Sequence, residues 1–375
     1  MRIRILYTVD CRLDNGGAPK STCILANEMA KTHDVYMLTP SEPNADKCVF
    51  KVIQLGAYKD SFPFPFLHPL KYIRFIVDVN KAIREVNPDI IHTEMPRAAQ
   101  AIGVLKIMGK CKQPVIYTER EYVSGLRRIY KTMYKYLVAK PFNQIICLSK
   151  KATGFWYKYR NDGVDVIPNP GGVDYDHYSD EEEKIAKSRI KDYNGSSLNV
   201  FFVGRFIPSK RWDIVEDIIK HYNTTPAAVH FYIAVAFKET DEAAQNMIHS
   251  LEEYGNVTIY PNANNQQMSD LYYITDIHMI TSSIESFGRT AIEAMSRKCV
   301  VYSTDAGAIS ETIGFSKYIL PPNADDFVKV LREYENNVEM LRAEKEQMFN
   351  RYHKLYTTES NLNMHIALYN KLLNN

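Results

Sequence analysis

The sequence predicts an α/β protein made of two doubly wound domains. Short apolar runs, typical of buried strands, alternate with amphipathic runs that favour helices in both halves of the chain. Loops rich in glycine and aspartate follow the strands, as they do where parallel strands present their carboxyl ends to a ligand. A chain of 375 residues is also long enough to form two separate cores.

Composition and charge narrow the class of protein. The hydrophobic fraction of 45% and the charged fraction of 24% are typical of a soluble globular protein. A net charge of +2 argues against nucleic acid as the main partner. The six cysteines are scattered and form no C-x-x-C pair, which favours reduced thiols in the cytoplasm over a disulfide framework or a zinc site. Residues 1–5 predict a first strand rather than a signal peptide, and no apolar run approaches the roughly 18 residues that span a bilayer.

The first half begins with a buried strand over residues 3–9 and a helix over 19–31. Pro19 suits the first position of that helix, and Gly16 and Gly17 before it allow a close approach of backbone to ligand. A plain strand-to-helix turn is the alternative. The segment does not fit a P-loop because proline precedes Lys20, and without a G-x-G-x-x-G pattern a dinucleotide oxidoreductase is weakly supported. Further strands are expected over 34–39, 49–55, 88–93, 114–118 and 143–149.

Two stretches of this half are both aromatic and basic. Three prolines interrupt residues 61–75, and a predicted helix over 122–142 carries basic side chains among tyrosines. Such a helix either lies on an anionic membrane surface or is a solvated helix whose tyrosines pack on the core. We expect information about an acceptor in these stretches.

The second half begins with a polar linker over 175–197 and a strand over 198–203. Arg205 and Lys210 then precede a helix predicted to start near Arg211. Basic residues at a helix start oppose the helix dipole, at a cost of a few tenths to about 1 kcal/mol. A bound anion would remove this conflict, so the segment predicts an anion site.

Residues 278–312 predict a strand, a polar turn, a helix over 289–296, a second strand and a loop. Glu285 lies in the turn and Glu293 lies inside the helix. Between them the first backbone N–H groups, near Gly288 and Arg289, have no intrahelical partner and attract phosphate. Carboxylates can bind two neighbouring hydroxyls, as on a ribose or hexose. The pattern suits a nucleotide-sugar, and a capped surface helix with solvated glutamates is the alternative.

The segment ESFGRTAIEAM resembles the E-x7-E motif of the retaining glycosyltransferases of the GT-B fold, family 4. It keeps both glutamates, Phe287-Gly288 and Ala294-Met295. Other segments follow the family's order: the Gly16-Gly17 pair, V-I-P-N at 166–169, G-R-x-x-x-x-K at 204–210, and a loop from Asp305 to Glu311. In the last of these, Ala308 replaces the family's second glycine.

This resemblance implies two Rossmann-like domains that face a cleft. The acceptor-side domain would span 1–174 with a returning C-terminal helix over 357–375, and the nucleotide-sugar-binding domain would span 175–356. The implied reaction is retaining transfer of a hexose-type sugar, with a UDP-sugar as the expected donor, to a hydroxyl of a glycan or lipid-linked glycan in cell-surface polysaccharide biosynthesis. The enzyme would act in the cytoplasm, with peripheral contact to the inner face of an anionic membrane as a further expectation.

The resemblance also implies roles for individual residues. Arg205 and Lys210 would grip the donor diphosphate, so no metal or other cofactor is expected. Glu285 would hold hydroxyls of the transferred sugar and Glu293 the ribose. Phe287, Gly288 and Arg289, with Gly16 and Gly17, would complete the donor site.

One departure concerns the acceptor side. Family members often carry T-x-H after the strand that ends here at Thr118, but this chain has Thr118-Glu119-Arg120. Arg120 and Glu119 are therefore candidates for contact with the acceptor or the sugar, and an ion pair of Arg120 with Glu119 or Glu121 is the alternative. Two other functions stay open, a GT-B sugar-nucleotide epimerase and a non-catalytic protein that binds a sugar-nucleotide.

Overall fold

The computed structural model describes residues 2–13, 17–40, 48–120, 123–172, 175–190, 193–222, 228–285, 287–335 and 337–374. The chain divides into two compact units. Unit 1 comprises Met1–Gly172 with Thr358–Asn375, and unit 2 comprises Val173–Thr357. Sequence analysis places the corresponding limits at 174 and 356. Each unit is an α/β layered structure around one parallel sheet, as the sequence predicts.

Unit 1 contains a seven-stranded parallel sheet in the order β3-β2-β1-β4-β5-β6-β7. Its strands are β1 (Arg4–Thr8), β2 (Asp34–Thr39), β3 (Lys51–Gln54), β4 (Ile90–Thr93), β5 (Val115–Glu119), β6 (Gln144–Cys147) and β7 (Val164–Val166). The chain first builds outward from β1 to β3 and then crosses back to place β4 on the other side of β1. The carboxyl ends of β1 and β4 therefore form the topological switch point, where open α/β sheets bind ligands.

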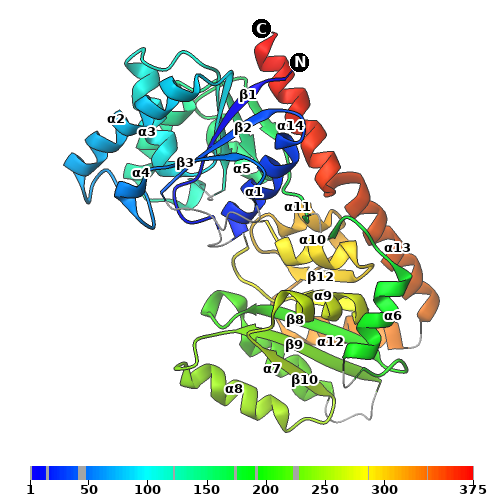
Figure 1. Ribbon diagram of the computed structural model, residues 1–375. Coiled ribbons are helices and arrows are strands. Elements are labelled where there is room, and N and C mark those ends of the chain that lie inside the picture. The colour runs from blue at the N-terminus through cyan, green and yellow to red at the C-terminus, as the bar shows by residue number, and fades with distance from the viewer. Residues whose placement is uncertain are drawn as a thin grey trace. The chain divides into compact units, whose positions relative to one another are not determined.

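Helices cover both faces of this sheet, as Figure 1 shows. Along β1, Leu6 packs into one core, whereas Ile5 and Tyr7 pack into the other, because successive side chains of a strand point to opposite faces. The first core lies under α2 (Pro69–Val86), α3 (Pro96–Ile107), α4 (Arg128–Tyr134) and α5 (Lys150–Trp156). The second lies under α1 (Gly17–Ala30) and α14 (Thr358–Leu373). Short turns complete the unit: η2 (Gly56–Tyr58), η3 (Val123–Gly125) and η4 (Lys135–Ala139).

The last helix of the chain belongs to unit 1. Leu368 and Tyr369 of α14 are buried in the same core as α1. The Tyr369 hydroxyl lies 2.7 Å from the Tyr7 hydroxyl and 2.6 Å from Nδ1 of His92. Leu362, Ile366 and Leu373 of the same helix pack against this core as well, so the final helix lies on the sheet formed by the first part of the chain.

Unit 2 contains a six-stranded parallel sheet in the order β10-β9-β8-β11-β12-β13. Its strands are β8 (Leu198–Arg205), β9 (Val229–Ala236), β10 (Val257–Pro261), β11 (Ile277–Ile280), β12 (Val300–Thr304) and β13 (Ile319–Leu320). The strand order reverses between β8 and β11, which are neighbours. Their carboxyl ends are the switch point of this unit.

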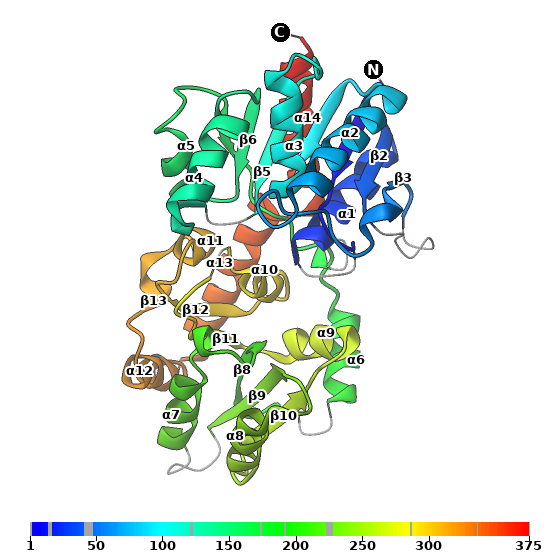
Figure 2. The ribbon, with the colours of Figure 1, turned by 90° about the vertical axis from the view of Figure 1, so that its left-hand side faces the viewer.

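The helices around the sheet of unit 2 pack against one another in pairs. In Figure 2, α7 (Trp212–Tyr222) lies beside α12 (Ala324–Glu335), and α6 (Asp180–Arg189) lies beside α9 (Asn265–Ile274). Similarly, α10 (Arg289–Ser296) packs against α13 (Val338–Leu355). The remaining helices are α8 (Glu242–Glu252) and α11 (Ile309–Ile313), with turns η6 (Pro208–Lys210) and η7 (Ser316–Tyr318).

The structure corrects one expected helix and defines the first residue of another. The basic helix predicted over 122–142 is shorter: α4 covers Arg128–Tyr134 and continues as a π-helical turn, η4, whose Val138 and Ala139 are buried. The helix predicted near Arg211 begins one residue later, at Trp212, because Arg211 adopts a left-handed conformation with φ of 52°. None of the described helices has the length and apolar character to cross a lipid bilayer.

Candidate functional site

The candidate donor site lies at the switch point of unit 2. Arg205 ends β8 and Lys210 follows it, Glu285 follows β11, and Asp305 follows β12. Since these three parallel strands are neighbours in the sheet, the loops at their carboxyl ends adjoin one another. Segments separated by about a hundred residues in the sequence are thereby brought to one edge.

Lys210 and Glu285 meet directly at this edge. The Lys210 Nζ lies 2.8 Å from Oε2 of Glu285, and the two side chains are 19% and 17% exposed. Gly204 makes room for the lysine, because a Cβ at this position would lie only 3.2 Å from Lys210 Cδ. An ammonium and a carboxylate thus stand side by side, partly open to solvent, and can bind an anion and a hydroxyl group next to each other.

Backbone contacts fix the loop that carries Glu285. The Thr281 hydroxyl donates to the Lys210 carbonyl at 2.8 Å, and the Ser283 N–H donates to the Ser209 carbonyl at 2.8 Å. On the other side, a Cβ on Gly307 would lie 1.6 Å from the Glu285 carbonyl oxygen. Only glycine permits this approach, and its φ of +61° also favours glycine. The loops after β8, β11 and β12 are therefore interlocked.

The start of α10 lies beside this loop. Gly288 is the N-cap with φ of 82°, and no side chain among the described residues caps the helix. A Cβ on Gly288 would meet Ile309 of α11 at 2.9 Å, so the turn sits tightly on that helix. Phe287 before it is only 5% exposed and contacts the ring of Tyr356. A helix start without a side-chain cap is suited to bind an anion.

Glu293 faces two donors within unit 2. The Arg289 Nε donates to Oε1 at 2.8 Å, and the Tyr272 hydroxyl donates to Oε2 at 3.0 Å. The carboxylate side chain is 12% exposed. Tyr272 is fully buried, and that burial, reinforced by the charge of Glu293, raises the pKa of its hydroxyl well above the usual value. Tyr272 therefore stays protonated and holds the carboxylate as a hydrogen-bond donor.

Besides Lys210, the segment from the end of β8 to the start of α7 contains two arginines, Arg205 and Arg211, which differ in their partners. The guanidinium of Arg205 is exposed, and within the described part of the chain no carboxylate pairs with it. Arg211 instead pairs with Asp213, with Nη2 2.7 Å from Oδ2, and this contact raises the pKa of Arg211 and lowers that of Asp213. Arg205 is thus the cation of this segment that is left available for an anionic ligand.

Unit 1 carries a second group of charged residues at its own switch point. Arg120, directly after β5, donates from Nη2 and Nε to Oε2 of Glu94 at 2.6 and 3.1 Å. Glu94 follows β4, the neighbouring strand, and is completely buried. The same carboxylate oxygen accepts a hydrogen bond from the Thr22 hydroxyl, and Nη1 of Arg120 donates to Asn169. Arg120 is only 7% exposed, so its charge is largely used inside the unit.

Buried histidines surround this ion pair. Nε2 of His92 lies 2.7 Å from the Thr118 hydroxyl and 3.7 Å from Oε1 of Glu94, the oxygen that has no hydrogen-bond partner among the described residues. Burial, and then the charge of His365, lower the pKa of His92 well below its usual value. Burial also lowers the pKa of His365 to about 4. A small pocket beside them is lined by Thr118, Arg120, Asn169 and His365 among others.

The comparisons with known families match both units. A model described as Glycosyltransferase Family 4 matches residues 15–177, and a model described as Glycosyl transferases group 1 matches residues 182–354. Together they cover most of the chain, the first lying mainly in unit 1 and the second in unit 2. The chain belongs to glycosyltransferase family 4 and has the GT-B fold.

Solved glycosyltransferase structures share this fold. A glycosyltransferase from Rickettsia africae superposes with a TM-score of 0.81 at 17% identity, covering 100% of this chain and 99% of that one. The Anabaena protein HepE, solved in complex with UDP, gives a TM-score of 0.80 at 15% identity, covering 98% and 100%. At these identities the likeness shows the fold alone.

A relative in sequence comes from Klebsiella pneumoniae. It is described as an uncharacterised 41.2 kDa protein in the cps region, and it is 23% identical over 272 residues, which cover 69% of this chain and 72% of the relative.

The structure brings most of the predicted donor residues of this glycosyltransferase to one edge of unit 2. These are Arg205, Lys210, Glu285, Phe287, Gly288, Arg289 and Glu293. Gly17 is the first residue of α1 in unit 1, and Gly16 lies outside the described residues. The roles assigned to all these residues remain predictions.

On the acceptor side the structure separates two residues that the sequence places together. Glu119 is 3% exposed and accepts hydrogen bonds from the Trp156 indole and the Val123 N–H. The Arg120 guanidinium pairs with Glu94, whereas the alternative left open by the sequence was an ion pair with Glu119 or Glu121; Glu121 lies outside the described residues. Glu119 is thus engaged in the core, and Arg120 alone lines the pocket.

Sequence reasoning missed several residues of both sites. Glu94 and Asn169 hold Arg120, Tyr272 holds Glu293, and Gly307 contacts the backbone of Glu285. A signal for Glu94 was available, since it directly follows a buried strand whose neighbour ends at Glu119. Tyr272 gave no such signal, because its hydroxyl reaches Glu293 from the buried side of α9. Within the described ranges, no group of three or more His, Cys, Asp or Glu side chains is arranged to hold a metal ion.

Proposed function

We propose that the protein is a retaining hexosyltransferase that uses a nucleotide-sugar, specifically a UDP-sugar, as donor. The acceptor is a hydroxyl of a glycan or lipid-linked glycan, and the pathway is the biosynthesis of cell-surface polysaccharide. Solved structures of the fold relative HepE hold UDP and UDP-glucose, which supports a UDP-sugar as donor. The cps-region relative supports a role in polysaccharide biosynthesis.

The arrangement at the switch point of unit 2 carries this proposal. Lys210 and Glu285 stand 2.8 Å apart, next to the start of α10, where the N-cap Gly288 has no side chain, and next to the exposed Arg205. A nucleotide-sugar needs this combination of groups, because its diphosphate lies directly beside the hydroxyls of its hexose. Glu293, one turn into α10, then offers a carboxylate for the ribose at the other end of the diphosphate.

The proposed roles follow from these positions. Arg205, Lys210 and the N–H groups at the start of α10 stabilise the negative charge that develops on the leaving diphosphate. Glu285 and the Phe287-Gly288 turn hold the hexose. The bond between the anomeric carbon and the diphosphate breaks, and the acceptor oxygen bonds to the same face of that carbon. The acceptor proton passes to the departing phosphate oxygen, so retention needs no enzymic nucleophile.

We also propose that this chemistry needs no metal ion. Two side-chain cations and a helix start supply positive charge where a divalent cation would otherwise act. Treatment with EDTA is therefore expected to leave the transfer rate unchanged. A rate that falls on chelation and returns on addition of Mg²⁺ or Mn²⁺ would contradict this part of the proposal.

For the acceptor side, we propose that Arg120 contacts the acceptor or the transferred sugar from unit 1. Its guanidinium lines the pocket after β5 and is held in place by Glu94 and Asn169. We further propose that the protein works in the cytoplasm as a peripheral protein at the inner face of an anionic membrane, where a lipid-linked acceptor would be found.

The decisive experiment combines binding with turnover. Purified protein is incubated with UDP-, GDP- and ADP-sugars, and thermal stability and release of free nucleotide are both recorded. A ligand at 100 times its dissociation constant adds about 2.7 kcal/mol of stability. Stabilisation by one UDP-sugar, with slow release of UDP, is the expected result.

The outcomes separate the alternatives. A sugar-nucleotide epimerase would convert the donor without an acceptor, so a second sugar-nucleotide would appear in the product analysis. A non-catalytic binding protein would be stabilised but would release no UDP. No response to any of the three classes of nucleotide-sugar would refute the donor site.

A further inference from the structure

Helix α2 of unit 1 carries two apolar stripes. Tyr72, Phe75 and Val79 lie on the side that packs in the core. A second stripe at helical spacing faces solvent, where Leu70 is 82% exposed, Ile73 60% and Val77 61%. A helix that only covers a sheet needs one apolar stripe, so the outer stripe calls for an explanation.

A second element extends this apolar surface. Phe66 and Leu67, just before α2, are 54% and 69% exposed. The ring of Phe66 makes an edge-to-face contact with the ring of Tyr130 in α4, at 6.2 Å between centroids. Ile129 beside it is 53% exposed. The Phe66–Tyr130 contact links the two stretches, and we call residues 64–77 and 127–136 together the outer face of unit 1.

The charged side chains within these stretches are all basic, and the acidic residues Asp60 and Asp78 border the first stretch. The stretches 61–77 and 126–140 contain no aspartate or glutamate. The first contributes two basic residues and the second contributes five: Lys71, Arg74, Arg127, Arg128, Lys131, Lys135 and Lys140. The Lys135 and Lys140 ammonium groups lie 5.0 and 4.8 Å from the centroid of the Tyr136 ring, so the chain keeps cations and an exposed aromatic ring together.

The outer face adjoins the carboxyl edge of the sheet. The Phe62 N–H donates to the Asp10 carbonyl at 2.9 Å, and Ser61 pairs with Cys11 in an isolated antiparallel β-bridge. The segment before α2 is therefore attached to the chain that follows β1. Helix α4 likewise follows the end of β5, where Arg120 lies. Phe66, Leu67 and the start of both helices are thus on the side of unit 1 where Arg120 lines its pocket.

We propose that the outer face docks on an anionic lipid bilayer. The apolar side chains of α2 and of Phe66 enter the headgroup region, and the basic residues contact anionic headgroups. Exposed aliphatic and aromatic side chains surrounded by lysine and arginine are typical of such surfaces, whereas the cores of protein–protein interfaces are depleted in lysine. This proposal deepens the proposed function and rests on it: it names the surface by which the peripheral protein would contact the membrane, and a lipid-linked acceptor would be met there.

Vesicle flotation with the full chain tests the proposal. Vesicles of phosphatidylcholine alone are compared with vesicles of phosphatidylcholine and phosphatidylglycerol, at low and high salt. We expect binding to the anionic vesicles only, and weaker binding as salt rises. The variant R127A/R128A/K131A is expected to bind about 100-fold more weakly, at roughly 1 kcal/mol per basic residue. The variant L70S/I73S/V77S is also expected to lose binding, although its net charge is unchanged.

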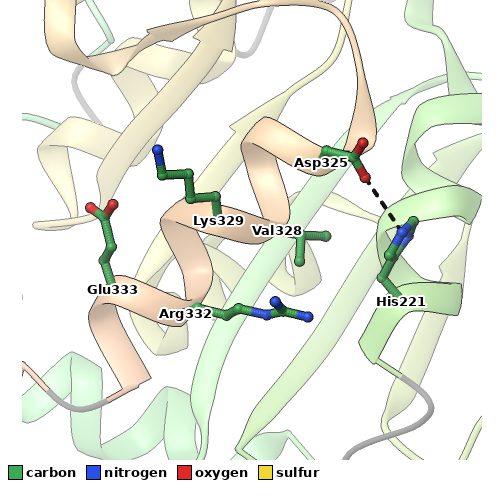
Figure 3. Close-up of a pocket in the computed structure, with 6 residues that line it drawn as sticks. All are labelled: His221, Asp325, Val328, Lys329, Arg332 and Glu333. Carbon is green, nitrogen blue, oxygen red and sulfur yellow. Dashed lines mark ion pairs between the residues drawn. The ribbon is translucent and has the colours of Figure 1, made fainter.

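Matched controls come from unit 2. The open surface between α7 and α12 presents exposed Lys329 and Arg332 near a His221–Asp325 pair 3.5 Å apart, as Figure 3 shows. Val338 is 74% exposed. The variants K329A/R332A and V338S remove the same kinds of side chain outside the outer face, and they are expected to bind vesicles as the unaltered protein does.

Three results would overturn the proposal. One is equal binding to neutral and anionic vesicles, and another is binding that neither triple variant weakens. The third is a dimer, seen by light scattering, that L70S/I73S/V77S converts to a monomer, since the face would then join two copies. Stabilisation by UDP-sugars, measured on the same samples, keeps the two proposals separate. Both triple variants are expected to retain it, and its absence in all samples would refute the donor assignment alone.

Discussion

Each unit places a pair of opposite charges at the carboxyl edge of its parallel sheet, after β4 and β5 in unit 1 and after β8 and β11 in unit 2, but the two pairs differ in exposure. In unit 1 the Arg120–Glu94 pair is 7% and 0% exposed and is held by Thr22 and Asn169. In unit 2 the Lys210–Glu285 pair is 19% and 17% exposed, and Arg205 beside it is open to solvent.

This difference indicates different uses of charge. A guanidinium enclosed with its carboxylate gains little from a further anion, because its charge is already balanced, and it serves best to hold a fixed shape. A partly exposed ammonium beside an exposed guanidinium is available to a diphosphate. We therefore expect unit 1 to depend on its pair for stability and unit 2 to depend on its pair for turnover.

Removal of Glu94 gives the largest expected change in stability. Glu94→Ala leaves Arg120 buried without its partner and is expected to lower the free energy of unfolding by about 3–5 kcal/mol. Denaturant unfolding measures the loss. Asp213→Ala is the control, since its pair with Arg211 is exposed and is expected to contribute at most about 1 kcal/mol. Similar losses in the two variants would remove the contrast.

Removal of Lys210 affects catalysis most. If Lys210 stabilises the leaving diphosphate, Lys210→Ala is expected to lower kcat by about 10²–10³-fold while the protein stays folded. Steady-state kinetics with the identified UDP-sugar measure this change, and Lys329→Ala serves as the control at an exposed position of unit 2. A Lys210→Ala enzyme that turns over within a few-fold of the control would mean that the ion pair is structural in this unit too.

Three buried histidines make the stability of the two units depend on pH to different extents. The pKa of His365 in unit 1 and that of His278 in unit 2 are lowered by burial to about 4, and that of His92 in unit 1 is also lowered. Between pH 6.5 and 4 the unfolded chain binds protons that the folded chain does not, so stability falls as pH falls, by up to about 3 kcal/mol near pH 4 for His365 and for His278.

Unit 1 carries two of these histidines and is expected to unfold first on acidification. The measurement is the stability of the protein and of His365→Leu as a function of pH. The variant is expected to show a shallower loss between pH 6.5 and 4. Curves of equal slope would show that other groups control the acid transition.

Glu293→Ala gives a smaller and more specific effect. Loss of charge-assisted hydrogen bonds to the ribose is expected to weaken donor binding by about 1.5–3 kcal/mol. Calorimetry with the donor measures this change, with Glu346→Ala on the exposed side of α13 as the control. Unchanged affinity in folded Glu293→Ala protein would mean that the carboxylate only anchors Arg289 and Tyr272.

The sequence was most informative about candidate functional residues that lie directly at the end of a strand. The predicted helix over 289–296 is confirmed as α10, and Arg205, Lys210 and Glu285 lie together because β8 and β11 are neighbours. Alternation of strands and helices was enough to predict both sheets. Turn geometry was harder to predict from the sequence. Arg211 adopts a left-handed conformation before α7 begins, and its side chain pairs with Asp213. A charge pattern reveals neither feature.

The sequence was least informative where distant segments share a buried space. The sequence identifies Arg120 as a candidate contact, with an ion pair to Glu119 or Glu121 as the alternative, but it does not identify Glu94 as its partner. In the structure Glu119, at the end of β5, points to the core that contains Trp156, whereas Arg120 points to the neighbouring strand end. The side of the sheet to which a side chain points, and the strand end that it approaches, depend on the order of the strands. No local sequence pattern encodes that order.

The membership of α14 in unit 1 has a consequence for folding during synthesis. Domains generally fold in the order in which they leave the ribosome. Here Tyr7 and His92 are made early, but their partner Tyr369 is made among the last residues. Until unit 2 has been translated, this face of the unit 1 sheet therefore has α1 but lacks α14. In the cell, a chaperone that shields this face would be needed longest for the part of the protein that emerges first.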